Sequence, residues 1–356
     1  MPCRTAVGQH VQDRGAVGRR AAGEAAPGGR PLARRRCLVA AAALGAGLPV
    51  PARAQDWPRR PVRVVVPYAA GGSTDVIARL VARALPDRLG QPVLVENRTG
   101  AGGNVAAEHV ARSAPDGYTL LMATNSSHGS SRSLYRSLPF DPVRDHTALS
   151  LLAVTPNALV VPAGLPADTT EGFVRLARER GAADRPLRYA SAGNGSSAHL
   201  AAAYLGVLIG AEMVHVPYRG GAPAVLALAA GEVDFLFIPA GEVLGHVRGG
   251  RLKALALSGP RRLTLLPDLP LVSEVLPGHD VPGWVGVAGP AGMPPAVVGR
   301  LGAELAGVME DEEVRATLVR QGVEPTVLGP AEFARFIAAE VPRWARLVEI
   351  SGARLD

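Results

Sequence analysis

The strongest constraint on the fold is an alternation between short apolar runs and stretches with helical spacing, which begins near residue 60. Residues 62–66 (VRVVV) predict a buried strand. The apolar residues that follow, between 76 and 89, recur every three or four positions and predict a helix that is capped by Ser73 or Thr74 and ended by Gly90. Strands that alternate with helices are typical of an α/β fold, which we therefore expect.

The alternation continues in two blocks along the chain. Further strands are expected at 92–96, 118–122, 158–161, 187–190, 213–216, 233–238, 254–257 and 284–288. Further helices are expected at 104–112, near 173–176, at 199–208, 223–230, from 294 onward, at 311–321 and at 331–350, the last kinked by Pro342. Since the chain crosses between blocks near 154–158 and again near 279–284, we predict two lobes with a ligand cleft between them. Residues 55–156 with 281–356 form lobe 1, and residues 157–280 form lobe 2.

The N-terminal 54 residues have the features of an export signal. Arg34, Arg35 and Arg36 precede an apolar core at 37–48 that is too short to span a bilayer, and the small-x-small site at 52–54 predicts cleavage before Gln55. Residues 1–33 are either an unusually long positive segment or the product of a misplaced start codon. We expect a periplasmic protein whose signal peptide is cleaved, and the general and twin-arginine export routes both stay open.

The predicted leader also carries the excess positive charge. The chain has 38 basic and 31 acidic residues, of which the leader holds nine and two, so 29 of each remain in residues 55–356. A net charge of zero argues against nucleic acid as a partner, because binding to phosphates depends on excess basic residues. Both cysteines, Cys3 and Cys37, lie in the leader as well.

Motifs for catalysis, metals or cofactors do not occur. The chain has no Gly-x-Ser-x-Gly elbow and no His-Glu-x-x-His motif, and its one lysine, Lys253, is not part of a phosphate-binding loop. The histidines after the leader are scattered singly, which does not suggest a metal site. We therefore expect no catalytic residues, no metal and no cofactor, and interpret the protein as a non-enzyme.

Three loops rich in Gly, Ser and Asn, at 68–75, 124–128 and 191–197, each follow a predicted strand, and the first and third open helices. A helix N-terminus presents unpaired N–H groups and a partial positive charge, and glycine lets an anion approach the backbone. Ordinary helix capping is the alternative for each loop. Two such loops, one in each lobe, predict a clamp for a small carboxylate, and Tyr218 is a candidate for the cleft lining.

A dinucleotide site is a remote alternative. Residues 193–198 match Gly-x-Gly-x-x-Ala after a predicted strand, and Glu212 lies at a suitable spacing for a ribose contact. The first strand–helix turn of the chain lacks the pattern, and an exported protein has no ready supply of nicotinamide cofactor. A nucleotide-dependent oxidoreductase is therefore not favoured.

Several segments together resemble the tripartite tricarboxylate transporter receptor family, the Bug-type extracytoplasmic solute receptors. They are residues 61–75, 96–104, 114–120, 191–199, 214–220 and 351–356. The resemblance covers the chain from about Trp57 to Asp356. It implies a periplasmic-binding-protein fold of type II with Venus-flytrap closure, and a monomeric receptor that delivers a small carboxylate to membrane permease subunits. An exported sensor for a two-component membrane kinase would share the fold and stays an alternative.

The resemblance also implies which residues bind the ligand. The first loop corresponds to Tyr68, Ala69, Ala70, Gly71, Gly72, Ser73, Thr74 and Asp75; the second supplies Asn125, Ser126 and His128, and the third Gly193, Asn194, Gly195, Ser196 and Ser197. One departure concerns Phe237, which relatives often follow with Asp or Asn but which Ile238 follows here. That change is expected to remove a polar group from the cleft and argues against an amino-bearing ligand such as aspartate.

Overall fold

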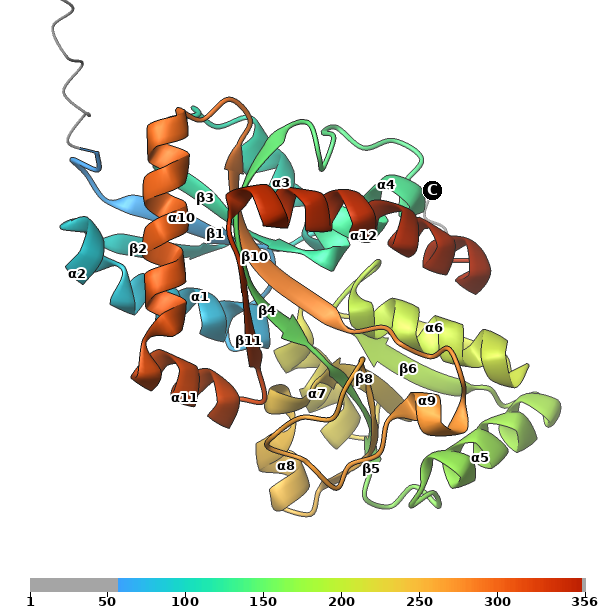
Figure 1. Cartoon of the computed structure of the whole chain (residues 1–356). Coiled ribbons are helices and arrows are strands. Elements are labelled where there is room, and N and C mark those ends of the chain that lie inside the picture. The colour runs from blue at the N-terminus through green and yellow to red at the C-terminus, as the bar shows by residue number, and fades with distance from the viewer. Residues whose placement is uncertain (1–56, 354–356) are drawn as a thin grey trace, which may run out of the picture. The chain divides into compact units, whose positions relative to one another are not determined.

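Two mixed β-sheets, with helices packed against them, organise the protein (Figure 1). The computed structural model describes residues 57–353, all of which belong to one unit of the chain, Ala54–Asp356. The predicted leader, including Cys3 and Cys37, lies outside the described residues. None of the helices within residues 57–353 has the length and apolar character needed to cross a membrane.

The first sheet contains six strands in the order β11-β4-β10-β3-β1-β2. They are β1 (Val62–Val66), β2 (Val93–Asn97), β3 (Thr119–Thr124), β4 (His146–Thr155), β10 (Gly283–Pro290) and β11 (Glu324–Leu328). β1 pairs in parallel with β2 and β3, whereas β10 lies antiparallel between β3 and β4. β4 and β11 were not expected from the sequence.

The second sheet contains five strands in the order β7-β6-β8-β5-β9. They are β5 (Asn157–Pro162), β6 (Leu187–Ser191), β7 (Met213–Pro217), β8 (Phe235–Pro239) and β9 (Leu252–Ser258). The chain passes from the first sheet to the second at Pro156, between β4 and β5, and returns through residues 259–282. The sequence analysis expected the crossings near 154–158 and 279–284.

The helices alternate with the strands as expected for an α/β protein. They are α1 (Ser73–Ala84), α2 (Pro86–Leu89), α3 (Asn104–Ala111), α4 (Ser131–Leu134), α5 (Thr170–Ala182), α6 (Ser197–Ile209), α7 (Gly221–Ala229), α8 (Leu244–Arg248), α9 (Val272–Val275), α10 (Pro295–Glu310), α11 (Glu312–Arg320) and α12 (Pro330–Ser351). Three shorter turns are η1 (Ala101–Gly103), η2 (Ser126–Ser130, a π-helical turn) and η3 (Ala240–Glu242).

Three local predictions were wrong. The single helix expected before Gly90 is divided into α1 and α2, because Pro86 cannot donate a backbone hydrogen bond and starts a new helix. The N-cap of α1 is Gly72, so Ser73 and Thr74 lie inside the helix and do not cap it. The polar loop predicted for 125–129 is the buried turn η2. Pro342 lies within α12, which continues past it.

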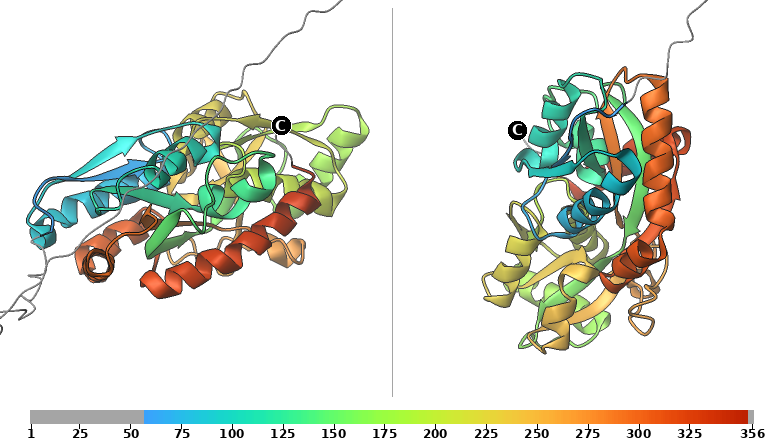
Figure 2. Two further views of the ribbon diagram at one scale, coloured as in Figure 1. Left: turned by 90° about the horizontal axis from the view of Figure 1, so that it is seen from above. Right: turned by 90° about the vertical axis from the view of Figure 1, so that its left-hand side faces the viewer.

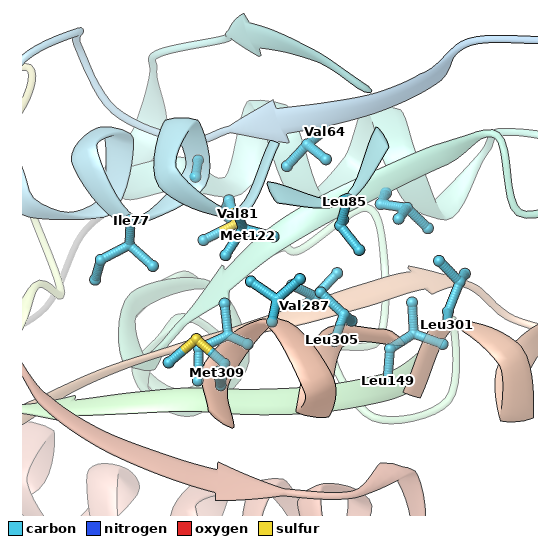
Figure 3. Packing of buried hydrophobic residues seen from close by; sticks show 14 of the residues in the cluster. Val64, Ile77, Val81, Leu85, Met122, Leu149, Val287, Leu301, Leu305 and Met309 are labelled. Atoms are coloured by element: carbon cyan, nitrogen blue, oxygen red, sulfur yellow. The ribbon is translucent and has the colours of Figure 1, made fainter. Parts of the chain in front are cut away.

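The core of the first sheet lies between β-strands and two helices from distant parts of the chain (Figure 3). Ile77 and Val81 of α1, with Leu85 directly after it, pack with Leu301 and Leu305 of α10 in this cluster. All five are at most 2% exposed. Each such side chain contributes about 1.5–3 kcal/mol of stability by leaving water. This packing fixes the N-terminal end of α1 relative to the sheet.

Helix α12 contacts elements of both sheets (Figures 1 and 2). Phe333 near its start packs with Leu151 and Trp284 of the first sheet, whereas Trp344 and Leu347 join the cluster formed by α6 and the second sheet. The C-terminal half of α12 therefore packs on the part of the chain that the sequence assigned to lobe 2, although residues 281–356 were placed in lobe 1.

Candidate ligand site

One cavity is lined by elements of both sheets. Its lining residues are Tyr68, Gly72, Ser73, Thr74, Thr124, Asn125, Thr155, Ala192, Ser196, Ser197, Ala198, Gly221, Ile238, Pro239, Glu242, Gly283, Trp284 and Val285. The space open to the centres of water molecules is about 40 Å³. Since one water needs roughly 10–15 Å³ by this measure, the cavity holds a few waters.

Seven of the residues predicted for the site line this cavity: Tyr68, Gly72, Ser73, Thr74, Asn125, Ser196 and Ser197. They come from the three predicted loops, which the fold brings to one place. Sequence reasoning placed Thr124 in the second loop without naming it as a ligand contact, and it did not propose Thr155, Gly221 or Glu242 for the site. Trp284 is buried and lines the cavity as well, and its Nε1–H donates to Glu340 Oε2 at 2.9 Å.

The N-terminus of α1 is one wall of the cavity. Its N-cap, Gly72, has no side chain to accept a hydrogen bond from the first turn. Instead, the Ser73 N–H donates to Glu242 Oε1 at 2.8 Å. The Ser73 hydroxyl is buried and has no partner among the described residues. A side chain that follows β8 of the second sheet thus takes the place of a cap on a helix of the first.

Asp75 braces the same turn from outside the cavity. Its carboxylate accepts hydrogen bonds from the Gly71 N–H, from Arg79 Nε and from Asn97 Nδ2 at 2.8–2.9 Å. Burial alone would raise the pKa of Asp75, but these bonds hold it below its ordinary value. Asp75 is therefore an ionised structural residue that fixes the loop.

Glu242 is the acidic group of the cavity. It ends η3, directly after β8, and its Oε2 is buried without a hydrogen-bond partner in residues 57–353. Burial raises the pKa of this carboxyl to about 7, although the Ser73 N–H favours the ionised form. A Cβ at position 221 would overlap the Glu242 carboxylate, so the glycine that begins α7 makes room for it.

The side of the cleft where Ile238 was expected to remove a polar group carries another one nearby. Ile238 and Pro239 do line the cavity, but Glu242 supplies a carboxylate four residues after Ile238. The signal in the sequence was a single charged residue in an otherwise apolar segment, 235–244. Nothing local indicated that it would meet a helix 169 residues away.

The N-terminus of α6 forms the opposite wall. Its N-cap, Ser196, accepts a hydrogen bond from the His199 N–H at 3.2 Å and donates one to the Gly193 carbonyl at 2.7 Å. The side-chain amide of Asn125 takes the orientation that satisfies its neighbouring hydrogen-bond donors. Its oxygen then accepts a hydrogen bond from the Ser197 N–H at 3.0 Å. The Ala198 N–H, in the same first turn, has no acceptor within the described part of the chain.

The remaining predicted site residues do not line this cavity: Ala69, Ala70, Gly71, Asp75, Ser126, His128, Gly193, Asn194, Gly195 and Tyr218. Several of them join the two sheets' elements to each other. The Ser126 hydroxyl donates to the carbonyls of Gly102 and Asn194, and the Ala69 N–H donates to the Arg219 carbonyl. Gly193, Asn194 and Tyr218, together with Tyr68, border a second cavity beside η1.

The loop at 193–198 is covered, which does not fit the dinucleotide alternative. The Gly195 carbonyl accepts a hydrogen bond from the Ser130 hydroxyl at 2.7 Å. A Cβ at position 195 would lie 2.7 Å from the Ser130 Oγ. No room remains there for a pyrophosphate to approach the backbone. Glu212, the candidate ribose contact, is exposed.

The histidines near the site belong to the core. His199 of α6 stacks on His215 of β7 with ring centroids 3.9 Å apart, and burial lowers their pKa values to about 4 and about 3. His128 in η2 packs against His146, and burial lowers the pKa of His128 well below its ordinary value. No group of three potential metal ligands occurs among residues 57–353. These histidines are neutral at pH 7.

Comparison with known proteins identifies the family. The sequence pattern of the tripartite tricarboxylate transporter family receptor matches residues 77–353. The chain belongs to this family. It is 36% identical to protein BugT of Bordetella pertussis over 314 residues, which cover 87% of this chain and 95% of that protein. The resemblance that the sequence motifs indicated is confirmed.

Solved structures of receptors confirm the fold. An R. palustris protein solved with adipate superposes with a TM-score of 0.80 at 33% identity, covering 83% of this chain and 98% of that one. MatC from Rhodopseudomonas palustris, solved with malate, has a TM-score of 0.76 at 32% identity and covers 82% and 99%. The receptor has the two-lobed α/β fold of periplasmic binding proteins, and its family and structural neighbours are solute receptors and not enzymes.

Proposed function

We propose that this receptor binds a small carboxylate in the cavity between α1 and α6 and delivers it to the membrane permease subunits of a tripartite transporter. The observation that supports this most directly is that the cavity lies between two helix N-termini. The described residues that line it include no lysine and no arginine. Helix N-termini bind anions through backbone N–H groups and the helix dipole. The relatives solved with adipate and malate support a carboxylate as the ligand.

The donors for the carboxylate are backbone groups and hydroxyls. The Ala198 N–H in α6 is without an acceptor, and the hydroxyls of Ser197 and Thr155 flank Gly283, where a Cβ would lie only 2.9 and 2.7 Å from their oxygens. Glycine at 283 thus keeps the floor of the cavity open. Hydrogen bonds in which the acceptor is charged are about twice as strong as neutral ones, so a few such donors hold a carboxylate without an ion pair.

Ligand entry requires the lobes to separate, because the cavity holds only a few waters as it stands. We place the hinge at Pro156 and at the return crossing near Val281, with lobe 1 and lobe 2 as predicted from the sequence. The contacts that would open include the hydrogen bonds between Ser73 and Glu242, Asn125 and Ser197, Ser126 and Asn194, and Ser130 and Gly195.

The receptor acts in the periplasm as a monomer after removal of its leader, and it releases the ligand chemically unchanged. The test is calorimetric titration of the purified protein with mono-, di- and hydroxycarboxylates, followed by mass spectrometry of the recovered ligand. Saturable binding with recovery of the intact ligand is the expected result. Product formation, or the absence of binding across the whole panel, would overturn the proposal.

A further inference from the structure

Glu242 already occupies one of the two positions in the cavity where a ligand carboxylate would be favoured. Among the described residues that line the cavity, it is the only one with an Asp, Glu, Lys, Arg or His side chain. Its Oε1 takes the Ser73 N–H at the start of α1. Its Oε2 lies against the first residue of α7, Gly221, and has no hydrogen-bond donor within residues 57–353.

The position of this carboxylate is fixed by close packing. The loop before it lies directly on α11, since a Cβ at Gly241 would overlap the Gln321 carbonyl. Gly221, which begins α7, leaves space for the carboxylate only because it lacks a side chain, since a Cβ there would overlap it. Glu242 is therefore held at the helix termini by its own loop and by the glycine at 221.

We propose that Glu242 determines the ligand class of this receptor, an inference that rests on the proposed function. The ligand carries a single carboxylate, which binds at α6, and a hydrogen-bond donor, an ammonium or a hydroxyl group, which binds Glu242. A dicarboxylate of the same length is disfavoured, because Glu242 occupies the position of its second carboxylate.

Charge and hydrogen bonding both support this assignment. A second ligand carboxylate would lie beside an acidic side chain in a confined cavity whose described lining has no cation to compensate, and like charges at short range repel strongly where water is scarce. A donor on the ligand would instead satisfy Oε2, and a buried acceptor left unpaired is costly. The buried Ser73 hydroxyl, also unpaired, is a further partner for such a group.

The protonation of Glu242 supports the same conclusion. The groups that face it are the Ser73 N–H of α1, the first residue of α7 and the phenol of Tyr68, and Asp75 on α1 is turned away toward Arg79. Because burial raises the pKa of Glu242 to about 7, its charge increases from pH 6 to pH 8. Discrimination against dicarboxylates should increase over the same interval.

The test compares ligands of equal length. The purified full chain is titrated at pH 8 with the pairs succinate and 4-aminobutanoate, glutarate and 5-aminopentanoate, and adipate and 6-aminohexanoate, together with 4-hydroxybutanoate and hexanoate. We expect at least one amino- or hydroxycarboxylate to bind tenfold or more tightly than both its dicarboxylate partner and the unsubstituted acid. Glu242→Gln should reduce this ratio at least tenfold, and the exposed control Glu179→Gln should not change it.

The outcomes separate the two proposals. Preferential binding of a dicarboxylate by the wild type, or a ratio that Glu242→Gln leaves unchanged, overturns the role of Glu242 while the proposed function stands. Failure of every probe to bind overturns the proposed function, and the role of Glu242 with it. If Glu242→Gln does not fold, the wild type alone decides: the ratio must rise between pH 6 and pH 8, and a constant ratio refutes the assignment.

Discussion

The two helix N-termini that face the cavity differ in how their first turns are satisfied. α6 is capped from within its own loop by Ser196, and Asn125 accepts a further hydrogen bond from it. α1 has glycine at its N-cap and obtains its acceptor, Glu242, from the other lobe. When the lobes separate, the α6 terminus therefore keeps its own cap, Ser196, and loses only the Asn125 contact, whereas the α1 terminus has no cap of its own and loses its acceptor.

This difference indicates unequal roles in binding. At α6 the cap leaves the Ala198 N–H without an acceptor and ready for a ligand carboxylate. At α1 the corresponding position is filled by an acidic side chain of the protein itself. An aspartate substituted into the first turn should therefore have a much larger effect at α6 than at α1.

The largest expected effect is that of Ser197→Asp, which should weaken binding of the best-bound probe at least 100-fold. Its carboxylate would occupy the position of the ligand's own, while an acid in the first turn of a helix favours folding. Ser73→Asp should weaken the same probe less than tenfold, because that position already adjoins Glu242. Calorimetric titration measures both, with Ser197→Asn as the uncharged control of similar size. Equal losses at the two positions would show that the termini bind alike.

The sequence predicted those elements around the cavity that depend on local pattern. The strand at 62–66 and the loops at 68–75 and 191–197 were recognisable, because apolar periodicity and glycine-rich helix starts are local properties. β4 was missed, since polar residues such as His146 and Ser150 interrupt its apolar pattern while the fold buries them. Glu242 was missed because its contact with Ser73 depends on how the two lobes meet, which no local pattern records.

The second effect concerns the stability of the ligand-free protein. In the folded state the pKa of Glu242 is about 7, against an ordinary value of 4.5, so the folded protein binds more protons than the unfolded chain between these pH values. Wild-type stability should therefore fall as pH rises from about 4.5 to 7. Glu242→Gln lacks this titration, and at pH 8 it should be more stable than the wild type by about 3 kcal/mol.

Urea unfolding at pH 4 and pH 8 measures this difference, with Glu179→Gln as the exposed control. At pH 4 the wild type and Glu242→Gln should differ little, because Glu242 is then protonated in both states. A lower stability of Glu242→Gln at pH 8 would mean that the ionised carboxylate stabilises α1 more than its burial costs, and the α1 terminus would then be as well satisfied as that of α6.

The smallest effect compares the two caps directly. Ser196→Ala removes the acceptor for the His199 N–H and the donor to the Gly193 carbonyl, and it should cost about 1–2 kcal/mol. Gly72→Ala should cost less, under about 1 kcal/mol, because Gly72 has no side-chain cap to lose, its φ of −79° is one that alanine readily adopts, and the new Cβ would lie 3.6 Å from Glu242 Oε2, an ordinary contact. Urea unfolding at pH 7 without ligand compares the two variants. Equal costs would show that α1 depends on its N-cap residue as much as α6 does, and that Glu242 does not serve as its cap.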